Sequence, residues 1–254
     1  MKAETIKAIL ALVVLVTMAV MTIAVPYGPD SVTRGQNDRR TTFGSGAQQV
    51  QAQAGNVTQL TINTTMLTNR WQGYYGNITG IITLDDANGY TLYDWYGGGA
   101  ISLVGEVYAA NETISSWAQI KCVNISSTGK GYNCSGQDEW CLNLTTIEIA
   151  FGMASSDADG VDETFTTTQP ITIGTTTLSN CPATNMYVNN ASQTTRWNET
   201  LLTINNSNSS LIFAAEVEQN ANGFNNKTWD FQMIVLDNGN VEGPTTYYFY
   251  VELA

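Results

Sequence analysis

The segment NETLLTINNSNSSLIFAAEVE, residues 198–218, decides how this chain is expected to fold. Leu211, Phe213, Ala215 and Val217 fall on one face, opposed by Glu216 and Glu218, which is typical of a strand with one buried face. A second apolar stretch precedes them and includes Leu202 and Ile204. Because the polar run NNSNSS separates the two stretches, the segment predicts a β-hairpin with an exposed, polar turn.

The same alternation recurs along the chain and predicts further strands. The residues assigned to their patterns are Leu60 and Ile62; Ile78, Gly80, Ile82 and Leu84; Ile101, Leu103 and Val107; Ile147, Ile149 and Phe151; Trp229, Phe231, Met233 and Val235; and Tyr247, Phe249, Val251 and Leu253. No helical period stands out beyond the N-terminus. We therefore expect an all-β fold, an antiparallel β-sandwich of Ig-like or jelly-roll-like type, preceded by one hydrophobic helix.

The N-terminus predicts export. An uncharged apolar run extends from Ala8 to Val25, and a helix of that length would reach about 27 Å, close to the thickness of a bilayer core. Residues 1–25 are therefore read either as a cleaved signal peptide or as a retained membrane anchor. Residues 26–55 read as a flexible or weakly helical stalk, and 56–254 as the ectodomain, either one sandwich or two split near 155–165.

Acceptor triplets for N-glycosylation, Asn-x-Ser/Thr, are unusually frequent. Random order of the 24 Asn and the 49 Ser and Thr would give only about five triplets. The chain has twelve: Asn56, Asn63, Asn77, Asn111, Asn124, Asn133, Asn143, Asn190, Asn198, Asn205, Asn208 and Asn226. The alternative is that Asn and Thr are common in turns and strands, but this does not explain their pairing. We expect outward-facing glycosylation.

The composition excludes several classes of function. The chain has no histidine, which excludes Ser-His-Asp triads, Cys-His dyads and histidine-based zinc sites. Its formal net charge is −12, so nucleic acid is not an expected partner. No pair of carboxylates is selected by its spacing, and we expect a protein that is not an enzyme.

Four cysteines in an exported chain suggest two disulfides. Cys134 and Cys141 bracket six residues that a local loop could close, which leaves Cys122 to pair with Cys181. The other two pairings remain open at this point. Zinc binding is not expected, because there is no Cys-x-x-Cys and no histidine.

The segment DADGVDE is the candidate metal site. It places four carboxylates around Gly160: Asp157, Asp159, Asp162 and Glu163. Alternating carboxylates with a glycine at the bend are typical of Ca²⁺ loops, although the segment lacks the later ligands of an EF-hand. The alternative is an acidic surface turn between strands.

Aromatic residues gather between positions 71 and 96. Exposed rings could stack on sugar rings, and the candidates are Trp71, Tyr74, Tyr75, Tyr93 and Trp95, with Tyr90 and Tyr96 nearby. The alternative is packing in the core or across strands.

The segments WQGYYGNITG (71–80) and TTYYFYVEL (245–253), with the apolar N-terminal run, resemble a group of exported cell-surface proteins of archaea. More loosely, the layout resembles archaeal pilins and surface-filament subunits, and IKAIL (6–10) is similar to a prepilin-peptidase site. The pilin resemblance implies cleavage after Ala8 and assembly into filaments through the N-terminal helix.

Together these patterns predict an extracellular, N-glycosylated, disulfide-bonded protein of the cell surface: a coat, adhesin or filament component. Its expected partners are the membrane, through Ala8–Val25 if that run is uncleaved, other surface proteins or glycans, and further copies of itself in a homo-polymer. The alternative is a carbohydrate-binding module that uses the aromatic residues, assisted by Ca²⁺.

Overall fold

The computed structural model describes residues 25–40, 49–95, 104–123, 143–204, 210–237 and 243–253. The protein is mostly β, and every strand pair is antiparallel. The prediction of an antiparallel β fold is thus confirmed at this level.

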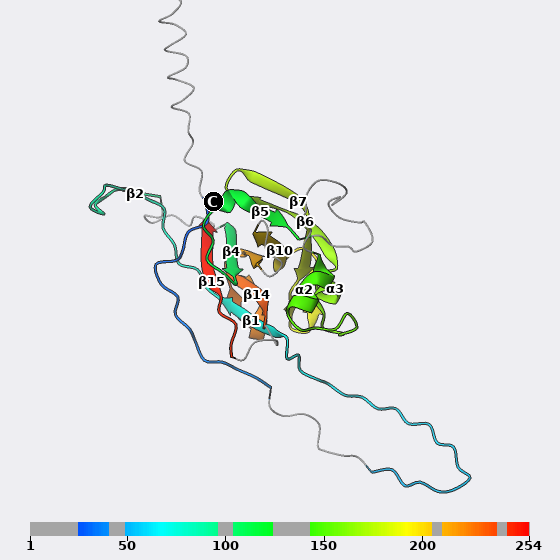
Figure 1. The fold of residues 1–254 in the computed structure, drawn as a ribbon. Helices are drawn as coiled ribbons and strands as arrows, with labels where there is room; N and C mark the ends of the chain where they lie inside the picture. The colour runs from blue at the N-terminus through cyan, green and yellow to red at the C-terminus, as the bar shows by residue number, and fades with distance from the viewer. Residues whose placement is uncertain are drawn as a thin grey trace, which may run out of the picture.

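A seven-stranded sheet forms the centre of the molecule (Figure 1). Six of its strands follow the order β15 (Tyr248–Leu253), β4 (Gly105–Ala110), β11 (Leu211–Glu216), β10 (Asn198–Ile204), β7 (Thr176–Asn185) and β6 (Thr167–Ile173). The seventh, β5 (Ile120–Cys122), also pairs with β10, beyond the part of β10 that pairs with β7. The sheet combines strands from before and after residues 155–165.

The predicted hairpin of residues 198–218 is present as β10 and β11. Leu202 lies opposite Ile212 and Leu201 lies opposite Phe213 in its register. Both faces of this hairpin are buried, because Leu201 and Phe213 belong to one core and Leu202 and Ile212 to another. The expected polar turn, 205–209, lies outside the described residues.

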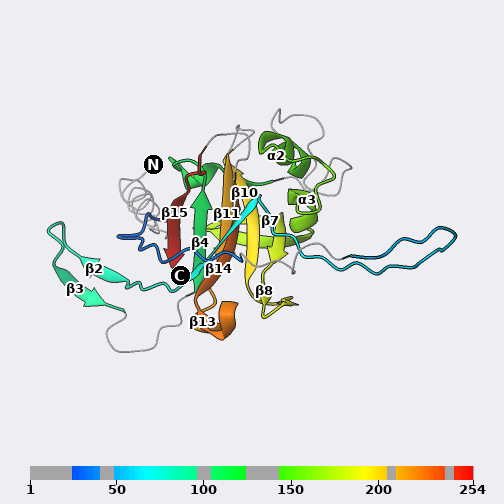
Figure 2. The same cartoon turned by 90° about the horizontal axis from the view of Figure 1, so that it is seen from below.

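One face of the sheet is covered by a two-stranded ribbon and two short helices (Figure 2). The ribbon pairs β1 (Trp71–Gly76) with β14 (Phe231–Leu236), and the helices are α2 (Leu144–Ala150) and α3 (Val161–Thr164). Between them lies the larger core, which takes Phe213 from the sheet and Met233 from the ribbon.

A second core lies on the opposite face, where the sheet curls. Tyr108, Ile173 and Leu202 are buried there, from three different strands. The backbone N–H of Gly174, in the turn after β6, donates a 2.9 Å hydrogen bond to Oε1 of Glu252 in β15. Since β6 and β15 are the two ends of the strand order, this bond links opposite edges of the curled sheet.

The strand predicted at Ile147, Ile149 and Phe151 is wrong, because these residues belong to α2 and its C-cap. The Asn143 side chain caps the helix by accepting a 2.7 Å hydrogen bond from the backbone N–H of Thr146. Ile147 and Phe151 are buried on one side of the helix while Ile149 is exposed, as a helical period requires.

The strand expected at Leu60 and Ile62 is also absent, and both side chains are exposed. Of the pattern from Ile78 to Leu84, only the end forms a strand, β2 (Thr83–Asp85), which pairs with β3 (Thr91–Asp94) in a projecting hairpin (Figure 2). Among the described strands, β2 and β3 pair only with each other and do not join the seven-stranded sheet.

The remaining elements are short. They are η1 (Trp117–Gln119), β8 (Tyr187–Val188) with β9 (Ala191–Ser192), and β12 (Ala221–Asn222) with β13 (Thr228–Trp229), the latter pair joined through η2 (Phe224–Asn226).

The chain meets the sheet immediately after the apolar N-terminal run. Tyr27 and Val251 of β15 exchange two backbone hydrogen bonds, of 3.0 and 2.8 Å, at the outer edge of β15. The described part of the predicted stalk, from Gly28 on, forms no helix or strand and is exposed. Within the described ranges, no helix has the length and apolar character needed to span a membrane.

Candidate functional site

The four carboxylates of the predicted calcium loop do not lie together in the structure. Oδ2 of Asp157 accepts a 3.0 Å hydrogen bond from the backbone N–H of Ala154 and lies 3.9 Å from an Arg70 guanidinium nitrogen. The Asp159 side chain accepts a hydrogen bond from the Thr68 hydroxyl. Both carboxylates are therefore bonded to groups other than their acidic neighbours.

A cluster of three carboxylates forms where α2 meets α3. Single oxygen atoms of Glu148, Asp162 and Glu163 lie within 4.8 Å of one another. Asp162 and Glu163 come from the predicted loop, but Glu148 comes from α2 and was missed. In the strand predicted over 147–151, the side chain of Glu148 would point away from the face that Ile147, Ile149 and Phe151 share. In the helix, its carboxyl group instead lies at the start of α3.

Glu148 is fully buried and only half satisfied. Its Oε1 accepts hydrogen bonds from the backbone N–H groups of Val161, at 2.8 Å, and Asp162, at 3.2 Å. Its Oε2 and the Oδ1 of Asp162 are buried without a hydrogen-bond partner among the described residues. Burial raises the pKa of Glu148, and the adjacent Asp162 side chain raises it further.

The other two carboxyl groups interact with each other. A hydrogen bond between the side chains lowers the pKa of Asp162 and raises that of Glu163. A methyl group at Gly160 would collide with Oε2 of Glu163 and with Oε1 of Glu148, so the approach of both side chains requires glycine here. Three carboxylates this close provide the oxygen ligands that hard cations such as Ca²⁺ prefer.

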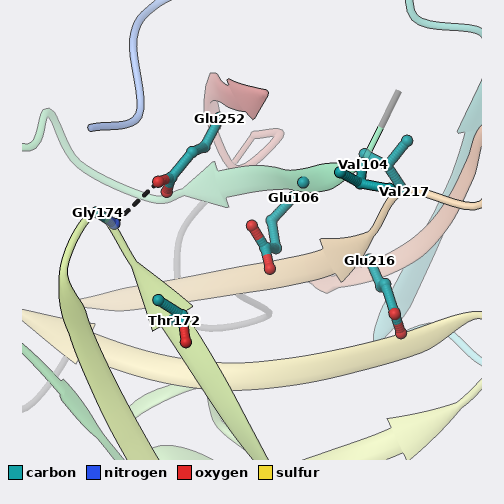
Figure 3. Close-up of a pocket in the computed structure, with 8 residues that line it drawn as sticks. Val104, Glu106, Thr172, Gly174, Glu216, Val217 and Glu252 are labelled. Carbon is teal, nitrogen blue, oxygen red and sulfur yellow. Dashed lines mark hydrogen bonds between the residues drawn. The ribbon is translucent and has the colours of Figure 1, made fainter. Parts of the chain in front are cut away.

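A second acidic site lies at the rim of the curled sheet (Figure 3). A cavity of about 310 Å³ is lined by Val104, Gly105, Glu106, Thr172, Gly174, Glu216, Val217 and Glu252. The strand register explains why three glutamates meet there: Glu106 of β4 lies opposite Glu216 of β11 on one side and Glu252 of β15 on the other.

The two outer glutamates of this row hold neighbouring segments. Glu252 accepts hydrogen bonds from the Gly174 backbone N–H and, at 3.2 Å, from the Tyr108 hydroxyl. Glu216 accepts a 2.7 Å hydrogen bond from Nδ2 of Asn198. Burial raises the pKa of Glu106 to about 7, and the charges of Glu252 and Glu216 contribute to the rise. The central carboxyl group therefore changes its charge near neutral pH.

The candidate sugar-binding aromatics separate into three groups. Trp71 and Tyr74 pack against the larger core, where Trp71 contacts Phe213 at 6.3 Å and Tyr74 contacts Phe249 at 5.4 Å between ring centroids. The Trp71 indole N–H also donates a 2.7 Å hydrogen bond to the carbonyl of Asp159. Packing in the larger core therefore explains the positions of Trp71 and Tyr74.

Tyr75 points to the other side of the ribbon and joins an exposed aromatic patch. Its ring lies 4.7 Å from Phe224 and 4.8 Å from Trp229 between centroids, and Tyr75 and Phe224 are 45% and 47% exposed. Tyr93 and Trp95 form a separate exposed pair, 5.0 Å apart, on the projecting β2–β3 hairpin and just after it. Phe224 and Trp229 were missed because they are far from Tyr75 in sequence.

The acceptor asparagines that the structure describes fall into two groups. Five are exposed: Asn56, Asn63, Asn77, Asn190 and Asn226. Three are half-buried, Asn111, Asn143 and Asn198, and the remaining four, Asn124, Asn133, Asn205 and Asn208, lie outside the described residues.

The half-buried acceptors also have structural contacts. The side-chain oxygen of Asn111 accepts a 2.8 Å hydrogen bond from the backbone of Leu211, and that of Asn143 caps α2. Asn198 uses its amide nitrogen to hold Glu216, so a sugar on Asn198 would replace one N–H of the group that makes this contact.

The predicted pairing of Cys122 with Cys181 is confirmed. The disulfide joins β5 to β7, with 4.8 Å between the Cα atoms and a sequence separation of 59. Both strands lie along the same side of β10, which brings the two residues together. The other predicted pair, Cys134 and Cys141, lies outside the described residues.

No family model matches the chain, and no curated protein or solved structure matches it either.

Proposed function

We propose that this chain is a non-catalytic, N-glycosylated protein of the cell surface, a coat, adhesin or filament component. The observation that carries the proposal is the Cys122–Cys181 disulfide inside a mostly β domain whose sequence holds twelve glycosylation triplets. Disulfides of this kind are typical of chains that fold in an oxidising, extracellular compartment.

The exposed acceptors support the same proposal. Asn226 lies in η2, at a turn closed by a 2.8 Å hydrogen bond from the Gly223 N–H to the Lys227 carbonyl. A sugar on such a residue would extend into solvent without disturbing the core. We interpret the β1–β14 ribbon over the seven-stranded sheet as a sandwich, and the Ig-like or jelly-roll-like type stays a prediction.

The site chemistry favours binding or structure over catalysis. In the glutamate cavity, Glu252 and Glu216 hold the Gly174 turn and Asn198, which ties segments of the sheet together. We propose that Ala8–Val25 either anchors the protein in the membrane or is removed. We also propose that the protein associates with other surface proteins, with glycans or with copies of itself.

Mass spectrometry of protein from its native source tests the proposal. We expect an intact mass well above 27.5 kDa and sugar on the Asn226 peptide. Asn226→Gln should remove one glycan, whereas Asn225→Gln, which changes the adjacent residue but leaves the triplet intact, should not. An unmodified native chain would contradict the proposal.

Carbohydrate binding is the second candidate, and the exposed patch of Tyr75, Phe224 and Trp229 favours it. Aromatic faces of this kind stack on the apolar faces of sugars. On a glycan array, we expect Phe224→Ala to lose binding and Trp95→Ala, on the projecting hairpin, to keep it. An array without signal for the wild-type chain would refute this candidate.

A further inference from the structure

We propose that Glu148, Asp162 and Glu163 bind a divalent cation, Ca²⁺, which fastens α2 to α3. The proposal is independent of glycosylation and of the glutamate cavity. It also replaces the ligand set that the loop sequence alone indicates, because it includes a residue of α2 and leaves out Asp157 and Asp159.

Unpartnered buried oxygens are the first reason. A buried carboxylate oxygen without a hydrogen bond is costly, because it has lost its water without gaining a replacement. Oε2 of Glu148 is such an atom within the described part of the chain, and the neighbouring Oδ1 of Asp162 is a second. Both atoms belong to residues of the cluster, in which one oxygen of each of the three carboxylates lies within 4.8 Å of the others. A cation between these groups would satisfy both atoms at once.

The positioning of Glu148 is the second reason. Its other oxygen, Oε1, is fixed by the backbone N–H groups of Val161 and Asp162, so the carboxyl group is held in one orientation. Gly160 allows the Glu163 carboxyl to approach from the exposed side. The site is thus rigid at its buried end and open to solvent at the other, which gives an ion a path of entry.

The oxygen ligands of this cluster favour Ca²⁺ over Mg²⁺. Ca²⁺ accepts six to eight oxygens in flexible geometry, including both oxygens of a carboxylate and waters, whereas Mg²⁺ requires a regular octahedron. Three carboxylates and water on the exposed side suit Ca²⁺ better. Extracellular Ca²⁺ sites have dissociation constants of roughly 10⁻⁴ to 10⁻³ M, and we expect this range.

The position of the site gives it a structural effect. Leu144 and Ile147 of α2 and Val161 and Phe165 around α3 are buried in the larger core. An ion that joins the two helices would therefore hold this side of the core closed, and its removal should lower the melting temperature.

Calorimetric titration of the purified full-length chain with CaCl₂ tests the proposal, with melting curves in Ca²⁺ and in EDTA. Tb³⁺ gives a third readout, because Trp71 contacts the carbonyl of Asp159, one residue before Gly160, and should sensitise its luminescence. We expect saturable binding, and a melting temperature several degrees higher in millimolar Ca²⁺ than in EDTA.

Two variants and one control assign the ligands. Glu148→Gln keeps an oxygen for the backbone donors but loses the charge, so Ca²⁺ affinity should fall at least tenfold. Glu163→Gln changes an exposed residue, and it should weaken binding similarly even if Glu148→Gln fails to fold. Asp159→Asn, in the same loop but outside the cluster, should bind within threefold of wild type.

Three results would overturn the proposal. They are the absence of heat and Tb³⁺ luminescence with wild type at millimolar ion, unchanged binding by Glu163→Gln, and loss of binding by Asp159→Asn alone. The last result would return the site to the loop that the sequence indicates.

Discussion

Replacing Glu106 by glutamine should stabilise the protein above neutral pH and leave it nearly unchanged in acid. Glu106 lies in the middle of the three-glutamate row, and its pKa is raised from 4.5 to about 7, first by burial and then by the charges of Glu252 and Glu216. The folded protein therefore binds this proton more tightly than the unfolded chain does. The resulting stability is present below pH 4.5 and is lost as the pH rises to about 7.

The size of the effect follows from the shift. A change of one pKa unit corresponds to about 1.4 kcal/mol, so a rise from 4.5 to about 7 corresponds to about 3 kcal/mol. Glutamine carries no charge at any pH and avoids this loss. Above pH 7, Glu106→Gln should unfold with a free energy up to about 3 kcal/mol greater than wild type, and at pH 4 the difference should nearly vanish.

Urea denaturation of both proteins at pH 4, 6 and 8, in EDTA, measures this difference. The other carboxyl groups are common to both chains, so the comparison reports Glu106 together with its interactions with Glu252 and Glu216. A pH-independent difference between Glu106→Gln and wild type would refute the reasoning.

Two further predictions concern stability. Replacing Cys122 and Cys181 together by serine should lower the free energy of unfolding by about 4 kcal/mol in urea, because the bond closes a long loop across 59 residues; equal stability of the oxidised and reduced wild type would contradict this. Glu199 is fully buried in β10, and its Oε2 accepts a 2.7 Å hydrogen bond from the backbone N–H of Ile234 in β14. Glu199→Ala should therefore cost about 2 to 4 kcal/mol in thermal or urea unfolding, and Glu199→Gln much less; similar losses for both variants would show that this hydrogen bond is unimportant.

The hairpin at 198–218 and the strand at the C-terminus could be predicted because their apolar alternation is long and each ends at a clear boundary. The Cys122–Cys181 pair followed from the short spacing of the other two cysteines. The helix α2 was missed because Ile147, Ile149 and Phe151 also fit a two-residue period. A helical signal was present in Asn143 as a capping residue and in the spacing of Leu144, Ile147 and Phe151.

The two acidic sites show what a linear reading cannot provide. Asp162 and Glu163 are adjacent to other acids in sequence and were found, but Glu148 joins them only through the packing of α2 on α3. Glu106, Glu216 and Glu252 are more than 100 residues apart at the extremes, and only the strand register aligns them. Sequence patterns indicate which face a residue occupies, but they do not indicate its neighbour on the next strand.

The contact between Tyr27 and Val251 covers part of the outer edge of β15. An outer strand with free backbone groups invites a strand from another molecule, and here Tyr27 occupies those of Val251. A protease that cut before Tyr27 would leave Tyr27 hydrogen-bonded to Val251. A cut shortly after Tyr27 would separate Tyr27 from the rest of the chain and could expose the edge of β15. If another molecule added a strand at this edge of β15, its strand would first have to displace Tyr27.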